Sequence, residues 1–153
     1  MPPADATTHD RPLRPLCLDI LEEGRRRFDA MLGIVSRISG DTYEIFAVSS
    51  MTGIPETGDL YALDAVYCRE VVRQRTTVAI TQIDGVAGMR LHPLYDTIPC
   101  EFYISSPIFL EGRVWGTLNF TSLEKRDGPF SPEDIAFNES RAARIAACIL
   151  SAS

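Results

Sequence analysis

The sequence predicts an α+β fold in which a central antiparallel sheet lies between an N-terminal and a C-terminal helix. Three observations support this prediction. Apolar residues recur at helical spacing near both ends of the 153-residue chain. Segments in the middle of the chain show the period of two that is typical of strands. Short turns join two pairs of these segments, so the paired strands are expected to run antiparallel.

The chain is expected to begin with an arm and to continue as one domain. Residues 1–15 hold four of the ten prolines and few apolar side chains, which favours a flexible, proline-rich arm. Residues 16–153 are assigned to a single domain. Its first helix is expected over 16–32, where Glu23 precedes Arg26 and Arg27 at the spacing of intrahelical ion pairs. One apolar stripe of this helix contains Cys17, Leu21, Gly24, Phe28 and Met31.

The middle of the chain is expected to contain two hairpins and a short helix. The segment 39–42, Ser-Gly-Asp-Thr, has the composition of a hairpin turn, and Glu111-Gly112 has that of a tight turn. Pro107 lies inside the strand before the second turn, which implies a sheet edge or a bulge. The expected elements are strands at 33–38 and 43–48, a loop at 49–63, a helix at 65–75, a strand at 77–83, an irregular stretch at 84–99, and strands at 101–110 and 113–122.

The last helix has a clear start signal. Ser131 suits the N-cap, Pro132 the first helical position and Asp134 the acidic position of a capping box. The helix that follows carries a narrow, alanine-rich seam, which would let another helix approach closely. We therefore expect this seam to be a dimer or signal-output surface. Its residues are Ile135, Asn138, Ala142, Ile145 and Ile149, of which all but Asn138 are assigned to that surface.

Composition excludes several classes of function. The net charge is −6 and no long Lys/Arg block occurs, which argues against binding to nucleic acid or to an anionic membrane surface. No apolar run is long enough to span a bilayer, and no signal peptide pattern is present, so a cytoplasmic location is expected. The four cysteines and two histidines do not show the spacing of a zinc site, so no metal ligands are expected.

Several strings of the sequence resemble a GAF domain, the sensory module of phosphodiesterases, phytochromes and sensor histidine kinases. The hairpin that contains Pro107 and ends in Gly-Thr-Leu-Asn at 116–119 is the most specific of them. The resemblance spans roughly residues 16–150. It implies terminal helices on one face of the sheet and a loop-covered ligand pocket on the other. The strings are AVYC at 65–68, LHPLY at 91–95, YISSPI at 103–108, VWGTLNF at 114–120 and PFS at 129–131.

Two branches of the GAF family carry motifs that this sequence matches only in part or not at all. Cyclic-nucleotide binders carry an N-K-x4-F-x3-D-E string, of which only Lys125, Phe130 and Asp134 are present here. We interpret Lys125 and Asp134 as a structural ion pair. Bilin binders attach their chromophore through a cysteine, typically in a Cys-His pair, and the sequence has no such pair. No covalent bilin is therefore expected, and the cofactor is unknown.

Strand alternation assigns residues to a pocket face and a helix face. In the last strand Val114, Gly116, Leu118 and Phe120 are expected to face the helices, and Thr121 is expected on the opposite face. An alternative is that Thr117 and Asn119 only satisfy loop backbone groups. A small anionic or polar ligand between Tyr67, His92 and Tyr103 is a further hypothesis. The candidate ligand contacts are Tyr67, Cys68, His92, Tyr95, Tyr103, Ser105, Trp115, Thr117 and Asn119.

Three functions compete on the sequence alone. The first is a non-enzymatic sensor that binds an unidentified small molecule and signals through its terminal helices, as a homodimer. The second is a structural dimerisation module without a ligand. The third is a free methionine sulfoxide reductase that uses Cys68 and Cys100. The 153 residues leave no room for an effector domain. The signal is therefore expected to pass to a separate protein such as a histidine kinase or cyclase, unless the chain is a piece of a larger receptor.

Overall fold

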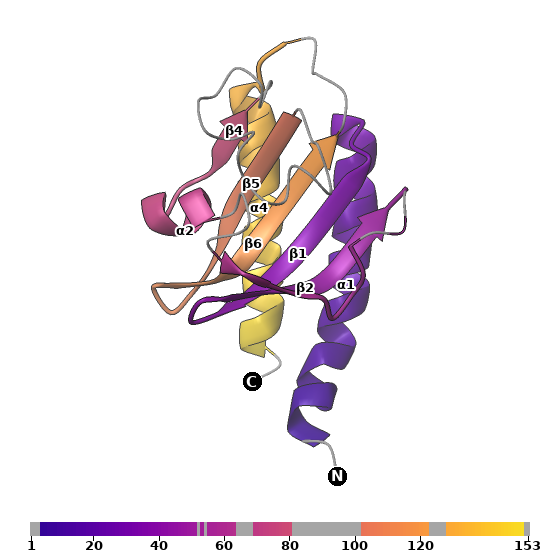
Figure 1. Ribbon diagram of the computed structural model, residues 1–153, viewed down its shortest axis with the longest axis vertical. Helices are drawn as coiled ribbons and strands as arrows, with labels where there is room; N and C mark the ends of the chain where they lie inside the picture. The colour runs from indigo at the N-terminus through magenta and orange to yellow at the C-terminus, as the bar shows by residue number, and fades with distance from the viewer. Residues whose placement is uncertain are drawn as a thin grey trace.

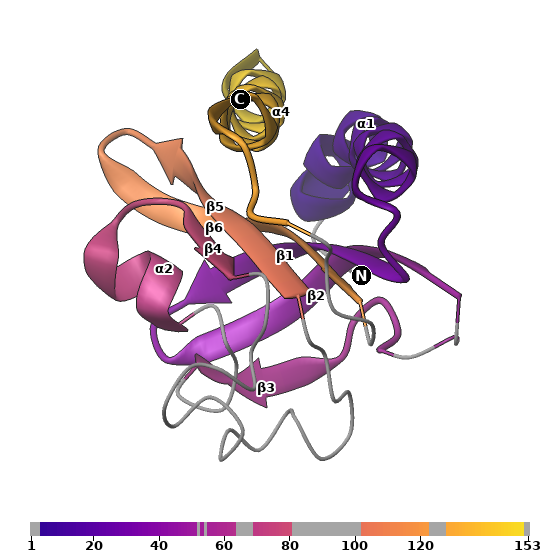
Figure 2. The ribbon, with the colours of Figure 1, turned by 90° about the horizontal axis from the view of Figure 1, so that it is seen from above.

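A six-stranded antiparallel sheet carries the first and last helices side by side on one of its faces (Figures 1 and 2). The computed structural model describes residues 4–51, 53, 55–63, 69–80, 102–122 and 128–151, and the side chains from residue 13 onward. The α+β architecture with helices at both ends of the chain is confirmed. Within this described part, no helix is both long enough and apolar enough to cross a bilayer.

The strands lie in the order β3-β2-β1-β6-β5-β4. The two predicted hairpins, β1–β2 and β5–β6, are both present. Gly40 and Gly112 take positive φ angles of 58° and 79° in their turns. The elements are α1 (Ala4–Phe28), β1 (Leu32–Ser39), β2 (Thr42–Ser50), β3 (Leu60–Ala62), α2 (Arg69–Gln74), β4 (Val78–Ile80), β5 (Phe102–Leu110), β6 (Arg113–Ser122) and α4 (Pro132–Ser151).

The main core lies between the sheet and the helices α1 and α4. Leu118 and Phe120 of β6 are fully buried in it, so their predicted place on the helix face is confirmed. The rings of Phe28 and Phe120 lie 5.4 Å apart between centroids. A Cβ atom added at Gly24 would lie 2.0 Å from Cζ of Phe120, so the helix needs glycine there to approach the sheet. The apolar stripe predicted for this helix is therefore a packing surface.

Helix α1 starts earlier than the sequence predicted. It begins at Ala4, so residues 4–15, which were expected to belong to a flexible, proline-rich arm, are helical. Leu13 is buried in the core one turn before Cys17, and thus extends the apolar stripe toward the N-terminus. The guanidinium of Arg14 donates a hydrogen bond to the carbonyl of Phe46 and lies 4.3 Å from its ring centroid. These contacts outweigh the helix-breaking tendency of Pro12 and Pro15.

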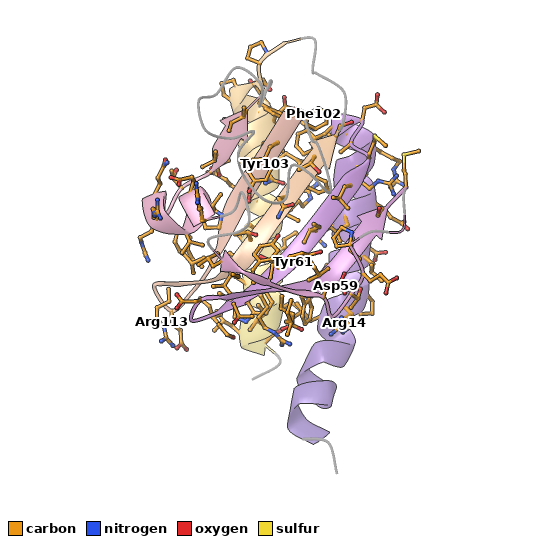
Figure 3. The ribbon with its side chains drawn as sticks, in the orientation of Figure 1. Arg14, Asp59, Tyr61, Phe102, Tyr103 and Arg113 are labelled. Atoms are coloured by element: carbon orange, nitrogen blue, oxygen red, sulfur yellow. The ribbon has the colours of Figure 1, made fainter. Side chains whose placement is uncertain are left out.

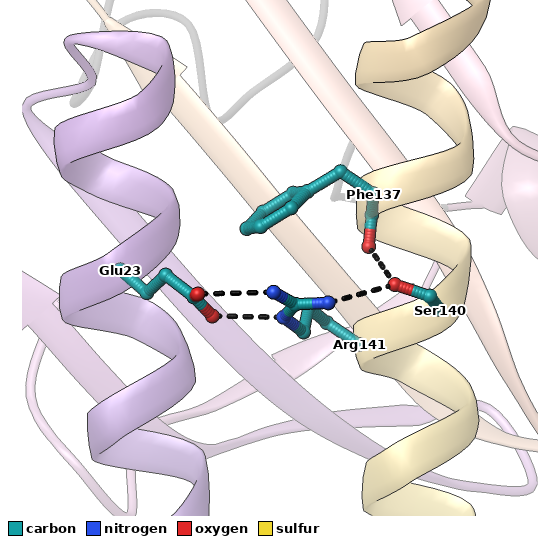
Figure 4. A network of polar contacts seen from close by, with 4 residues as sticks. All are labelled: Glu23, Phe137, Ser140 and Arg141. Carbon is teal, nitrogen blue, oxygen red and sulfur yellow. Dashed lines mark hydrogen bonds and ion pairs between the residues drawn. The ribbon is translucent and has the colours of Figure 1, made fainter.

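Helix α1 also ends earlier than expected, at Phe28. Asp29 takes a left-handed conformation with φ of 54°, and the N–H of Ala30 donates to the carbonyl of Arg25 at 3.0 Å. This is the geometry of a Schellman C-cap. Glu23 does not serve mainly its own helix: Arg141 of α4 donates two hydrogen bonds to its carboxylate, at 2.8 and 3.0 Å (Figure 4). The same guanidinium stacks over the ring of Phe137 of α4 at 4.4 Å, so the pair with Glu23 joins the two helices.

One expectation for the connecting segments needs correction. The stretch 49–63 was expected to be a loop, but it contains the short strand β3, which pairs with the start of β2. Helix α2 begins at Arg69 in the described residues, and its Val71 is buried. Residues 64–68 and 81–101 lie outside the described part, and so do the predicted strand end at 81–83 and the irregular stretch at 84–99.

The expected irregularity near Pro107 is present. Ile108 pairs with Gly116 but Phe109 pairs with Val114, so Trp115 is an extra residue on β6. Pro107 is tolerated in β5 because β4 pairs with β5 only from Tyr103 to Ser105, and Pro107 lies beyond those residues. A second extra residue occurs in β2, where Val35 pairs with Ala47 and Ser36 with Ile45. The extra residue of that bulge is Phe46.

The capping box at the start of α4 is confirmed. The N–H of Asp134 donates to Oγ of Ser131, and the N–H of Ser131 donates to the Asp134 carboxylate, both at 3.0 Å. The seam predicted as a dimer or output surface is used within the chain. Ala142 and Ile145 are buried against the sheet of their own chain, and Ile135 and Ile149 are partly buried beside them. Docking of α4 on β5 accounts for the narrow seam.

Candidate functional site

Five polar side chains occupy the middle of the sheet on the face opposite α1 and α4. All of them project from strands, and all of them are buried. Strand register places Ser36 beside Thr117, Asn119 beside Ser105, and Thr121 beside Tyr103. We call this set the polar strip, and its members are Ser36, Ser105, Thr117, Asn119 and Thr121.

One end of the polar strip is closed by mutual hydrogen bonds. The hydroxyls of Ser36 and Thr117 lie 2.6 Å apart, and the N–H of Thr117 donates to Oγ of Ser36 at 3.0 Å. Nδ2 of Asn119 donates to the hydroxyl of Tyr43 at 3.2 Å. These bonds fix the side chains in place, so this end of the strip is rigid and preorganised.

The other end of the polar strip contains a hydroxyl without a partner among the described residues. Oγ1 of Thr121 is buried and makes no hydrogen bond within that part of the chain. Leaving a buried hydroxyl unpaired costs about 1–3 kcal/mol, and native proteins rarely retain such groups without a reason. Thr121 therefore offers both a donor and an acceptor to a group that enters from this face.

Apolar and aromatic side chains surround the polar strip. Leu32, Ile34, Ile45, Tyr43 and Tyr103 form a second cluster of buried residues on this face. The rings of Tyr43 and Tyr61 meet edge to face, with centroids 6.4 Å apart. Burial, and after it the nearby carboxylate of Asp59, raises the pKa of Tyr61, so this phenol stays protonated and can donate. Apolar walls with a few fixed polar groups are typical of small-molecule sites.

The structure brings together part of the predicted ligand contacts. Tyr103, Ser105, Thr117 and Asn119 share the face to which they were assigned (Figure 3 labels Tyr103). Tyr67, Cys68, His92 and Tyr95 lie outside the described residues. The described side-chain bonds of Thr117 and Asn119 run to strand residues. The alternative that they serve loop backbone groups stays a prediction.

The predicted place of Trp115 on this face is wrong. Its indole packs on the helix-side core, with its centroid 5.6 Å from that of Phe46 and the rings nearly perpendicular. The cause is the bulge, because one extra residue on β6 reverses the alternation of faces beyond that point. Both extra residues of the sheet, Phe46 and Trp115, thus pack against each other.

Sequence reasoning missed two members of this site. Ser36 follows Ile34 and precedes Ile38 on the same face of β1, so a polar residue in an apolar row was visible as a signal. Tyr43 gave no such signal, because only the register of β1 with both neighbours brings its hydroxyl to Asn119.

The predicted ion pair of Lys125 with Asp134 is not tested, since Lys125 lies outside the described residues. Asp134 pairs with Arg27 of α1 at 3.3 Å, in addition to its role in the capping box. The acid therefore ties the start of α4 to the end of α1.

The described cysteines lie on the helix side of the sheet. Cys17 of α1 is fully buried, and burial raises the pKa of its thiol to about 12. Cys148 of α4 packs beside the same core and is partly exposed. A thiol that stays protonated is a poor nucleophile. Among the described residues there is also no group of three or more His, Cys, Asp and Glu side chains placed to hold a metal.

Comparison with solved structures shows the same fold. The GAF domain region of a putative membrane protein from Geobacter sulfurreducens PCA is 15% identical with a TM-score of 0.77, covering 95% of this chain and 98% of that one. The blue-light absorbing PixJ GAF domain of Thermosynechococcus elongatus is 17% identical with a TM-score of 0.75, covering 93% and 87%. The type II free methionine-R-sulfoxide reductase of Thermoplasma acidophilum is 16% identical with a TM-score of 0.74, covering 94% and 96%.

Sequence comparison identifies the family of the chain. No curated protein matches the chain. The family model described as "GAF domain" matches residues 12–149, which is nearly the whole chain and includes every described strand. The match to the family model and the observed fold agree with the resemblance of the sequence strings to GAF domains. This chain is therefore a member of the GAF domain family.

Proposed function

We propose that this chain is a non-enzymatic sensory domain that binds a small, uncharged, hydrogen-bonding molecule on the polar strip. The observation that carries the proposal is the buried hydroxyl of Thr121, which has no partner among the described residues and lies beside a rigid set of bonded polar groups. A ligand that bonds to Thr121 would offset the cost of burying it. The ligand itself is not identified by the fold, because GAF folds serve unrelated ligands.

The chemistry of the described strands favours an uncharged ligand. The side chains of this face are hydroxyls, an amide, tyrosine rings and aliphatic groups, with no charged residue among the described strand positions. A buried charge would need an opposite charge or a dense set of hydrogen bonds. Because these described positions carry no charge, they favour a neutral polar ligand over the anionic ligand that the sequence also allowed.

The same described residues favour binding over catalysis. The polar strip holds no histidine, lysine or carboxylate that would activate its hydroxyls as nucleophiles. The cysteine chemistry of a sulfoxide reductase would fall to Cys68 and Cys100, outside the described residues. The resemblance to the Thermoplasma acidophilum reductase is one of fold, and no described residue favours that activity.

A chain of hydrogen bonds offers a route from the sheet to α4. Asn138 donates to Ser106 at 2.8 Å, the hydroxyls of Ser106 and Thr77 lie 2.8 Å apart, and Thr77 donates to Glu139 at 2.6 Å. Ser106 is the neighbour of Ser105, which belongs to the polar strip on the other face. A ligand that shifts β5 would therefore shift α4, provided that α4 has two stable positions.

The outward faces of α1 and α4 are the proposed output surface, in place of the buried seam. Leu18 and Leu150 are 43% and 51% exposed, on helices that lie side by side (Figure 1). We assign to this surface either a second copy of the chain or a separate signalling protein, such as a histidine kinase or cyclase, in the cytoplasm.

Melting curves before and after ligand removal test the proposal. A ligand that binds only the folded state raises the melting temperature, so protein refolded from denaturant after dialysis should melt lower than protein as isolated. Thr121→Val should remove most of that difference, while Thr57→Val, at an exposed loop position, should preserve it. Equal melting temperatures for isolated and refolded wild type would favour the structural module without a ligand.

A further inference from the structure

A pocket of about 490 Å³ lies at the end of the sheet where both hairpins turn, away from the polar strip. The turn of the β1–β2 hairpin and the strand ends of the β5–β6 hairpin form its walls, and Val72 of α2 contributes a third side. The volume lies within the range of small-molecule sites, about 300–1,000 Å³.

The bulge in β6 creates this pocket. Because Trp115 is the extra residue and turns to the helix side, Val114 loses the place on the helix face that the sequence predicted. Val114 instead lines the pocket, together with Ile38 of β1. Bulges often occur beside functional sites because they redirect side chains, and this one opens an apolar space between the two hairpins.

Two arginines line this apolar space. Arg75 follows α2 in a left-handed conformation with φ of 55°, and its Nη2 donates to the carbonyl of Gly112 at 2.7 Å. The bond spans from α2 to the β5–β6 turn and leaves the other guanidinium donors of Arg75 available. Arg113 is exposed at the start of β6 (Figure 3). Among the described residues, the side chain of Arg113 has no hydrogen bond or ion pair, and no carboxylate lines the pocket.

The charge of the pocket is opposite to that of the chain. The protein carries a net charge of −6, and Asp41 and Glu111 stand in the same two turns without lining the pocket. Two guanidiniums beside apolar walls match an oxyanion joined to an apolar body, because the planar fork binds carboxylate and phosphate oxygens in pairs.

We propose that this hairpin-end pocket is a second binding site, which takes a small oxyanion, a carboxylate or phosphate ester, carried on an apolar body. The oxyanion bonds to Arg75 and Arg113, and the body lies against Ile38, Val72 and Val114. The proposal is independent of the polar strip, since that strip has no charged side chain among its described members.

The single tryptophan of the chain makes the test direct, because Trp115 is one of the residues that line this pocket, although its ring packs on the helix-side core. The indole N–H gives one signal in a nitrogen–proton correlation spectrum. Titration with 2-naphthoate or 2-naphthyl phosphate should shift that signal to saturation. The neutral 2-naphthamide should bind at least about tenfold more weakly, since it lacks the charge-assisted bonds. Binding of the phosphate alone, of the carboxylate alone, or of both identifies which oxyanion the site takes.

Matched variants separate the site from nonspecific attraction. Arg113→Gln and Arg75→Gln should each weaken binding of the preferred oxyanion about tenfold. Arg144→Gln, at an exposed position of α4, should not change it, and neither should Thr121→Val in the polar strip. The side chain of Arg113 makes no bond within the described fold, so its variant is expected to fold normally. The proposal is overturned if neither anion moves the indole signal, if the amide binds as tightly as the anions, or if Arg113→Gln binds like wild type.

Discussion

At the scale of single residues, the hydroxyls of Thr117 and Thr121 differ in one respect. Both are buried on the same face of β6, but Thr117 bonds to Ser36, whereas Thr121 has no partner in the described part of the chain. The same substitution, threonine to its isostere valine, therefore removes a satisfied group at one position and an unsatisfied group at the other.

Thr117→Val and Thr121→Val should change stability in opposite directions in protein freed of small molecules. Thr117→Val should lower the free energy of unfolding by about 1 kcal/mol, because it removes a hydrogen bond. Thr121→Val should raise it by up to about 1 kcal/mol, because it removes an unpaired buried hydroxyl. Urea denaturation followed by circular dichroism measures both. Equal losses in the two variants would show that Thr121 has a structural partner.

The Glu23–Arg141 pair should make stability depend on acid pH. Its hydrogen bonds lower the pKa of Glu23 below the ordinary carboxyl value of 4.5. The stabilisation is therefore complete above pH 4.5 and is lost as the pH falls through the lower pKa of the folded state. Because Glu23 is 41% exposed, the effect should stay below about 1 kcal/mol.

Glu23→Gln isolates this contribution. The difference in unfolding free energy between wild type and Glu23→Gln should be constant from pH 7 to pH 5 and should shrink toward pH 3. Glu133→Gln, at an exposed position in the first turn of α4, is the control for general effects of removing a carboxylate. A difference that does not shrink in acid would argue against the pair.

At the scale of elements, the sequence was most informative where the signal is local. The helix stripes, the two hairpin turns and the capping box depend on residues within one or two turns of each other, and each is present. The bulges at Phe46 and Trp115 depend on contact between strands far apart in sequence, so the face of Trp115 could not be predicted. The start of α1 was missed because docking of Leu13 and Arg14 overrides local proline preferences.

The candidate site shows the same division. Alternation along one strand was enough to place Thr117 and Asn119 on the face opposite the helices. Which side chains meet them depends on register with β1 and β2, which one sequence does not reveal. The hairpin-end pocket was not predicted at all, because it follows from the bulge.

The contact of α1 with the sheet should be sensitive to a single methyl group. Alanine is the better helix former by about 1 kcal/mol, so Gly24→Ala would stabilise an isolated helix. Here the added Cβ would lie 2.0 Å from the buried ring of Phe120, and overpacking of this kind costs about 1–3 kcal/mol. We therefore expect a net loss in unfolding free energy.

Two comparisons check the Gly24 prediction. Gly128→Ala, where an added Cβ would meet nothing within 4 Å, should change stability by less than about 0.5 kcal/mol. Phe120→Leu in the Gly24→Ala background should cost less than Phe120→Leu alone, because the smaller side chain relieves the clash. Additive losses in the double variant would contradict the predicted contact.

At the scale of the whole molecule, the two faces of the sheet have separate tasks. One face holds the helices and the main core, and the other holds the polar strip. Hydrogen bonds through Ser106 connect α4 to the strand that both faces share. In a sensory domain this arrangement would let an event on one face be read on the other.

Dimer formation through the outward faces of α1 and α4 can be tested separately from ligand binding. Leu150→Arg places a charge on the proposed surface and should convert a dimer into a monomer. Leu60→Arg, at a 65% exposed position of β3, should leave the oligomeric state unchanged. Sedimentation velocity measures both. A wild-type monomer at high micromolar concentration would point to a separate protein as the partner.

The central claim, that the polar strip holds a small molecule, is tested most directly by native mass spectrometry. Wild type and Thr121→Val would be incubated with the same small-molecule extract of cells and desalted under identical conditions. The account predicts a wild-type mass that exceeds that of the chain by one small molecule, released on denaturation, with much lower occupancy in Thr121→Val. A bare chain in both spectra, or equal occupancy in both, would contradict it.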